Sequence, residues 1–179
     1  LNGLAQAVIA AGGEIATGTR VLSVTGGEPC QIECEAGLVQ AQAVFIATHI
    51  PINDAVLFTQ NEPYQSYVIA ARLPEGTPYP DGVFWDTEDP YFYTRTAMDS
   101  DGPLLVVGGA DHKTGHEQDT EQRLDAVEDY VRQRYGDVTV IHRWSAQFYE
   151  PADGLPFIGA YPKQENVYAA TGYSGNGLT

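Results

Sequence analysis

The sequence predicts an α+β fold in which short strands outnumber helices. Three observations support this. Segments of alternating apolar and polar residues recur along the chain between glycines and prolines. One strongly periodic helix lies between residues 119 and 136, and the apolar run 43–47 is typical of a strand covered on both faces, as in a parallel sheet. With 179 residues, the chain has the length of one domain or of two small lobes that share a core.

The first part of the chain is predicted to form a helix and then strands. An apolar stripe marks the helix, which ends at Gly12-Gly13; the stripe consists of Leu1, Leu4, Val8 and Ile9. Alternating segments predict strands at residues 20–25, 31–35 and 38–48.

The middle of the chain continues with strands at residues 66–73, 83–85, 91–96 and 104–107. The helix that follows is capped by Asp119 or Thr120 and ends at Gly136, and its apolar stripe consists of Leu124, Val127 and Val131. Strands at residues 138–144 and 167–170 are predicted next, and residues 153–159 read as a rigid turn leading into a strand.

Charge excludes two classes of partner. The chain has 24 acidic residues against nine Lys and Arg, a formal net charge of −15. A nucleic acid or an anionic membrane needs a clustered basic surface, and the sequence has none. No apolar run has the length of a membrane span and no signal segment opens the chain, so we expect a soluble, cytoplasmic protein.

The two cysteines, Cys30 and Cys34, are four residues apart. On a strand they share one face about 13 Å apart, which is too far for a disulfide. We expect small, half-buried side chains in a reducing compartment and no zinc site.

Three further segments carry residues of chemical interest. Strand alternation places Tyr91, Tyr93 and Arg95 on one face, where the guanidinium could hold a carboxylate with two hydrogen bonds or form a structural ion pair. Asp111, His112 and His116 are donors for a metal, but Gly115 indicates a loop, and we expect no metal site. The glycine-rich segment 172–179 follows an apolar strand and is either a ligand-binding turn or a plain one.

Several segments occur together in an order that resembles one family. These are Gly12-Gly-Glu-Ile, Thr19-Arg-Val-Leu-Ser-Val, Ala43-Val-Phe-Ile-Ala-Thr-His, residues 143–159 and residues 166–179. Together they resemble the FAD-dependent oxidoreductases of the D-amino-acid oxidase type, which include glycine and sarcosine oxidases. The segment Gly108-Gly-Ala-Asp-His-Lys-Thr-Gly resembles a subgroup that often carries a Rieske iron–sulfur domain.

The resemblance implies an antiparallel substrate-binding sheet with a flanking helix, together with part of an FAD/NAD(P)-binding lobe. Residues 1–50 would belong to that lobe, residues 51–150 would form the substrate-binding sheet domain, and residues 151–179 would return to the lobe. The implied reaction is oxidation of the C–N bond of an amino acid or small amine. FAD is the implied cofactor of the whole protein, and an iron–sulfur domain is an implied partner.

The resemblance also assigns site residues. Val21, Ala47 and Thr48 would contact FAD, and Tyr93 and Arg95 would contact the substrate. The segment that would wrap the flavin ring consists of Gly172, Tyr173, Ser174, Gly175, Asn176, Gly177, Leu178 and Thr179. Its backbone N–H groups would stabilise the negative charge of reduced flavin. The family needs no protein base for hydride transfer, so no catalytic residue is assigned.

The sequence departs from the family pattern in its glycines and cysteines. It contains no Gly-x-Gly-x-x-Gly turn to hold the FAD pyrophosphate on a helix N-terminus, and its cysteines lack the Cys-His boxes of a Rieske centre. The chain begins without Met inside a helix and stops in a turn, which indicates a piece of a longer protein. We therefore expect this chain alone to lack FAD and to be inactive. The alternative is a binding or interaction module that retains the fold without catalysis.

Overall fold

In the computed structural model, residues 1–50 and 59–175 are described. The chain divides into two compact units. The first consists of Leu1–Ala55 with Phe157–Thr171, and the second of Val56–Pro156 with Gly172–Thr179. The α+β prediction is confirmed, because most strand pairs in each unit are antiparallel and only two helices occur in the described residues.

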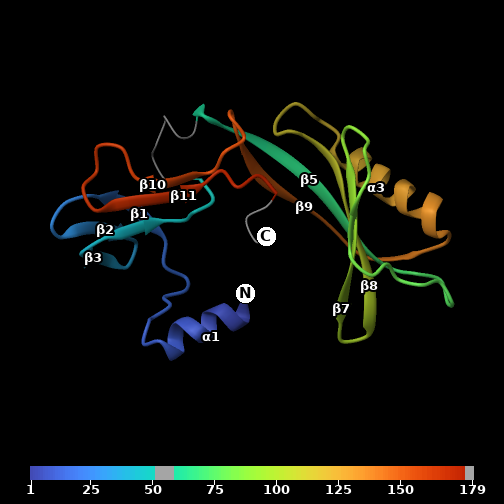
Figure 1. Cartoon of the computed structure of the whole chain (residues 1–179), viewed down its shortest axis with the longest axis horizontal. Coiled ribbons are helices and arrows are strands. Elements are labelled where there is room, and N and C mark those ends of the chain that lie inside the picture. Colours follow the sequence, from blue (N-terminus) through green and yellow to red (C-terminus); the bar gives the residue numbers. More distant parts are fainter. Residues whose placement is uncertain (51–58, 176–179) are drawn as a thin grey trace. The chain divides into compact units, whose positions relative to one another are not determined.

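The first unit contains helix α1 (Asn2–Ala10) and two three-stranded sheets, and Figure 1 labels all of their strands except β4. One sheet has the order β1-β2-β3 and is antiparallel; its strands are β1 (Val21–Thr25), β2 (Cys30–Cys34) and β3 (Gly37–Ala41). The other has the order β10-β11-β4; its strands are β10 (Phe157–Ala160), β11 (Val167–Thr171) and β4 (Val44–Ile46). Strand β4 runs parallel to β11, and this is the parallel pairing that the apolar run predicted.

Two details of the first unit differ from the sequence-based expectation. Residues 38–48 form two strands in different sheets, β3 and β4, instead of one. Strand β4 is covered on one face only: Ile46 is buried, whereas Phe45 is 64% exposed and stacks on Tyr168. The loops of the two sheets meet closely, since the Gly26 N–H donates to Gln164 and the Gly27 N–H donates to the Glu165 carbonyl.

The second unit is a five-stranded antiparallel sheet of order β6-β7-β8-β5-β9. Its strands are β5 (Asn61–Arg72), β6 (Val83–Trp85), β7 (Phe92–Asp99), β8 (Gly102–Lys113) and β9 (Thr139–Pro151). All five predicted strands are present, and β5, β8 and β9 extend well beyond the predicted ranges. In β8 and β9 the added residues include Asp111 and Glu150, which line the site described below.

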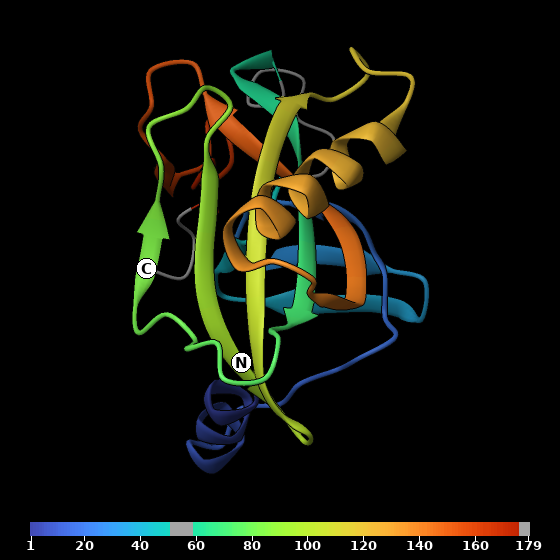
Figure 2. The same cartoon turned by 90° about the vertical axis from the view of Figure 1, so that its right-hand side faces the viewer.

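Helix α3 (Thr120–Tyr135) lies across one face of this sheet (Figure 2). Asp119 caps it by accepting a hydrogen bond from the Gln122 N–H, and Gly136 follows its last residue with φ of 79°, as predicted. The predicted stripe is buried against alternate residues of β5 and β8 in one core cluster. That cluster includes Leu124, Val127, Val131, Tyr67, Ile69, Ala71, Leu105, Val107 and Ala110.

A β-bulge interrupts the pairing of β5 with β8. Gln65 pairs with His112 and Tyr67 pairs with Gly109, so Ser66 stands opposite two residues, Ala110 and Asp111. Ala110 has φ of 54° and Gly109 has φ of 145°, which absorb the extra residue. The bulge shifts the alternation of β8 by one position. Ala110 therefore joins the core under α3, and Asp111 faces the other side of the sheet.

Among the described residues, no helix is both long and apolar enough to cross a membrane.

Candidate functional site

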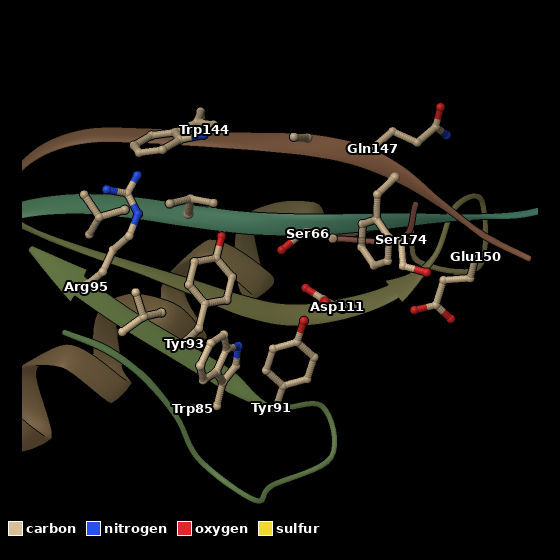
Figure 3. A pocket seen from close by; sticks show the side chains of 16 residues that line it. Ser66, Trp85, Tyr91, Tyr93, Arg95, Asp111, Trp144, Gln147, Glu150 and Ser174 are labelled. Carbon is tan, nitrogen blue, oxygen red and sulfur yellow. The ribbon is translucent and has the colours of Figure 1, made fainter. Parts of the chain in front are cut away.

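A pocket of about 820 Å³ lies within the second unit, on the face of the sheet opposite α3. Its floor consists of residues that alternate with those of the core cluster, among them Ser66, Val68, Val106 and Ala146. Polar and aromatic side chains line its walls, and Figure 3 shows Tyr91, Tyr93 and Asp111 directed into the pocket. One face of the sheet is therefore filled by a helix and the other forms a cavity.

A row of residues across all five strands explains why the sheet is hollow there. Trp85 pairs with Tyr93, Tyr93 with Gly108, Gly108 with Val68 and Val68 with Trp144. Aromatic side chains stand at both edges of this row and glycine at its centre. A Cβ at Gly108 would collide with the ring and hydroxyl of Tyr93, so the glycine is what lets that ring lie across β8.

The predicted face of Tyr91, Tyr93 and Arg95 is confirmed as a geometric arrangement, since all three line the pocket. Trp85 stands beside them on the edge strand. Arg95 forms no ion pair with a residue that the structure describes, whereas Arg72, Arg123, Arg132 and Arg143 each do. The structural ion pair that the sequence left open for Arg95 is therefore not observed. Its contact with a substrate stays a prediction.

Two carboxyl groups, Asp111 and Glu150, face the same pocket. Burial raises the pKa of Asp111, and a hydrogen bond with Ser66 and the charge of His112 oppose this change. Burial also raises the pKa of Glu150, and the charge of Asp111 adds to this effect. The Oδ1 atom of Asp111 is buried and has no hydrogen-bond partner among the described residues.

The tyrosines respond to the same carboxylate. Burial raises the pKa of Tyr91 and of Tyr93, and in both cases the charge of Asp111 is the next cause. A hydrogen bond from Ser66 and the charge of Arg95 act in the opposite direction on Tyr93. The charge of Asp111 thus acts on three other side chains of the pocket, Tyr91, Tyr93 and Glu150.

The glycine-rich segment contributes to one edge of the pocket through Ser174 and Gly175. The Ser174 N–H donates to the Tyr149 carbonyl, which ties this turn to β9 and uses one of the N–H groups predicted to face flavin. Gly172 is buried and has φ of 75°, and a Cβ at Gly175 would meet no atom within 4 Å. The predicted residues Asn176, Gly177, Leu178 and Thr179 lie outside the described residues.

The other predicted FAD contacts belong to the first unit. Val21 begins β1 and is half-buried, and Ala47 and Thr48 follow β4 and are exposed. The Thr48 hydroxyl donates to the Ile50 carbonyl at 2.8 Å. Their contact with a cofactor stays a prediction.

The histidines and cysteines have other roles. One ring nitrogen of His112 lies 2.8 Å from the Tyr67 hydroxyl, and within the described ranges no three His, Cys, Asp or Glu side chains are grouped to hold a metal ion. Cys30 is buried, Cys34 is half-buried and both are free.

Several lining residues carried no signal that sequence analysis used. These are Ser66, Trp85, Trp144, Gln147 and Glu150, together with Asp111, which the sequence pattern marks only as a possible metal ligand. The aromatic pair could have been found from alternation, because Trp85 and Trp144 each fall in a predicted strand. Asp111 could not, because the bulge reverses the alternation before it.

Comparison with known proteins bears on the whole chain. The family model "DAO: FAD dependent oxidoreductase" matches residues 1–179. YhfW of Bacillus subtilis, whose name refers to a Rieske 2Fe-2S iron–sulfur protein, is 25% identical over 183 residues, which cover 100% of this chain and 36% of that protein.

Solved structures share the fold. Glycine oxidase from Geobacillus kaustophilus superimposes with a TM-score of 0.77 at 20% identity and covers 98% of this chain and 48% of its own. L-proline dehydrogenase from P. horikoshii gives a TM-score of 0.74 at 18% identity, with 98% and 50% covered. The chain thus spans about half the length of these enzymes and about a third of YhfW.

Proposed function

The chain belongs to the family of FAD-dependent oxidoreductases, and on this basis we propose that it supplies the substrate pocket of an enzyme that oxidises the C–N bond of an amino acid or small amine. Under this proposal, residues 51–150 form the substrate-binding domain, and residues 1–50 and 151–179 contribute to the cofactor lobe. The observation that carries the proposal is the pocket on the open face of the sheet, lined by Tyr91, Tyr93 and Arg95 and bordered by Ser174 and Gly175.

The described residues fit one end of FAD. A side chain added at Gly175 would meet no atom within 4 Å, and the turn that holds this glycine is fixed to β9, so a planar ring has room to approach the backbone. For the pyrophosphate, the chain has no Gly-x-Gly-x-x-Gly turn, and neither α1 nor α3 follows one. We infer that Gly172–Gly175 contact the ring end and that groups outside this chain hold the phosphates.

Bound FAD supplies the acceptor for a hydride from the carbon of the C–N bond. The chain's own residues would bind and orient the substrate. Arg95 would hold a carboxylate with two parallel hydrogen bonds, and the rings of Tyr91 and Tyr93 would exclude water from the substrate. The 179-residue chain alone is expected to purify without stoichiometric flavin and to be inactive.

The electron acceptor of the whole protein is a separate proposal. The name of YhfW supports an iron–sulfur domain as the partner that takes electrons from the flavin. Such a domain would give a characteristic electron paramagnetic resonance signal in the reduced whole protein, and the absence of any such signal would exclude it.

Arg95→Lys tests the substrate contact. In the whole protein we expect KM for a carboxylated amine to rise about tenfold or more, which corresponds to roughly 1.4 kcal/mol, because Lys keeps the charge but loses the two-pronged geometry. An amine without a carboxylate should show no change in KM.

The matched control is Arg143→Lys. Arg143 lies on β9 and pairs with Asp125 at 2.7 Å, so this substitution tests a structural arginine of the same sheet and should leave the kinetics unaltered. If KM and kcat of the Arg95 variant both stay within twofold of wild type, the assignment of Arg95 to substrate is wrong. A flavin-loaded whole protein that oxidises no amine would favour the binding module instead.

A further inference from the structure

We propose that the pocket recognises its ligand through a positively charged organic nitrogen, held by Asp111 and Glu150 against the aromatic walls. That this ligand is the substrate rests on the proposed function. All residues of the binding site belong to the second unit.

The bulge in β8 is the first support. Without an extra residue, strict alternation from Val106 and Gly108 would put Ala110 in the pocket and Asp111 under α3. The bulge reverses these two positions, so an apolar methyl enters the core and a carboxylate enters the cavity. Figure 3 shows Asp111 directed into the pocket near Ser66 and Tyr91.

The second support is that neither carboxyl group is neutralised by an ion pair within the described residues. Asp111 Oδ1 is buried without a hydrogen bond, and neither Asp111 nor Glu150 takes part in an ion pair within those residues. The lysine closest to them along β8, Lys113, pairs with Glu62 at 2.6 Å instead. Burial raises the pKa of each carboxyl group, and it outweighs the opposing charge of His112 on Asp111 and that of Lys113 on Glu150. A bound cation would supply a direct counter-charge to both.

The third support is the composition of the walls. Trp85, Tyr91, Tyr93 and Phe148 line the pocket with Asp111 and Glu150. Aromatic faces attract ammonium and methylated ammonium groups by cation–π interaction, which strengthens when water is excluded. A metal ion would gain little from such walls, and in the described part of the chain no cluster suits one.

The position of Arg95 adds a restriction on the ligand. Along the sheet, Arg95 is opposite Val106, which pairs with Ala70, whereas Glu150 pairs with Glu62. The two charges therefore lie toward opposite ends of β5, and Figure 3 shows Asp111 between them. An amine with a carboxylate at its far end matches this order, whereas a ligand with anionic groups at both ends would place one beside Asp111 or Glu150.

Tryptophan fluorescence of the 179-residue chain can test the inference. The sequence contains two tryptophans, Trp85 and Trp144, and both line this pocket. The probe is choline, a small quaternary ammonium, titrated in parallel with its uncharged carbon isostere 3,3-dimethylbutanol. The two differ in charge and little in shape, so the difference in Kd measures recognition of the positive nitrogen.

We expect choline to bind at least about tenfold more tightly than the isostere, and Asp111→Asn to remove that preference. Glu150→Gln should reduce it as well, and serves if the first variant does not fold. Asp129→Asn removes the same charge from an exposed position on α3 and should leave choline binding unchanged.

Two results would overturn the inference. One is a chain that binds choline no better than its isostere, which includes binding neither. The other is a choline affinity that stays within twofold of wild type in both pocket variants. Because these titrations need no flavin, their failure is distinct from an unchanged KM in the Arg95 variant, which bears on the proposed function.

Discussion

The two faces of the five-stranded sheet are built from the same strands and have opposite properties. On the face covered by α3, Tyr67, Ile69, Leu105 and Val107 are at most 1% exposed and form a continuous apolar core. On the other face, the residues between them open onto a cavity with two carboxyl groups and an arginine. Because successive side chains of a strand point to opposite faces of the sheet, the same strands supply both the apolar core and the lining of the pocket.

This contrast shows where polar groups can be tolerated. On the pocket face an apolar patch of Val68, Ala70, Leu104 and Val106 holds one part of the sheet together, so only the remainder is polar. The stability of this unit should therefore depend on the helix face, and its binding properties on the pocket face. Three substitutions test that division.

Leu105→Ala should have the largest effect. The side chain is fully buried under α3, and its removal should reduce the free energy of unfolding by about 2–5 kcal/mol. Chemical denaturation measures the loss, and Met98→Ala, at a position 72% exposed on the same sheet, should change it by less than about 0.5 kcal/mol. Choline affinity of the folded variant should be retained; a loss would mean that the two faces are coupled.

Gly108→Ala should have an intermediate effect on stability and a large one on the pocket. The added methyl collides with the Tyr93 ring, which must move, and such overpacking costs about 1–3 kcal/mol. The Trp85 neighbour of Tyr93 should report the movement as a change in fluorescence. Gly175→Ala is the control, since its methyl meets no atom within 4 Å; equal effects of both variants would contradict the proposed role of Gly108.

Asp111→Asn should have the smallest effect on stability and the opposite sign. The pKa of Asp111 is raised in the folded chain, so the folded state binds its proton more tightly than the unfolded state does. Stability is therefore lost as pH rises from the ordinary pKa of aspartate to the raised value, and the ionised carboxylate is unfavourable above it. The variant should unfold at a higher temperature than wild type at neutral pH.

Thermal unfolding at a series of pH values checks this sign. The gain should vanish at acidic pH, where Asp111 is protonated in both states. The groups around Asp111 that also titrate or carry charge are Glu150, His112, Tyr91, Tyr93 and Arg95, and they remain in the variant. A variant less stable than wild type at neutral pH would show that Asp111 stabilises the fold.

Sequence patterns predicted the elements of this fold better than its site. Helix α3, its cap at Asp119 and its buried stripe follow from a 3.6-residue period that no tertiary contact disturbs. The shared face of Tyr91, Tyr93 and Arg95 follows from strand alternation in the same way. These are local properties of the chain.

The rest of the site depends on pairing between distant segments. Glu150 enters the pocket because β9 pairs with β5 over its whole length, although only its first part alternates. Phe45 is exposed because its strand is covered on one face, which an apolar run cannot indicate. The position of Asp111 could not be predicted for a different reason. The bulge that turns it into the pocket depends on how β8 pairs with β5, and the amino-acid composition of β8 does not indicate that pairing.

The bulge at Ala110 also determines where β8 tolerates a change of length. Deletion of Ala110 would let Ser66 pair directly with Asp111, which regularises the ladder and leaves every later side chain on its present face. Insertion of one residue in β8 before the bulge would instead exchange the two faces beyond it and carry Asp111 under α3. The loss of one residue at position 110 therefore leaves the Asp111 carboxylate in the pocket. A relative that lacks this residue in a sequence alignment is expected to keep the same charge in its site.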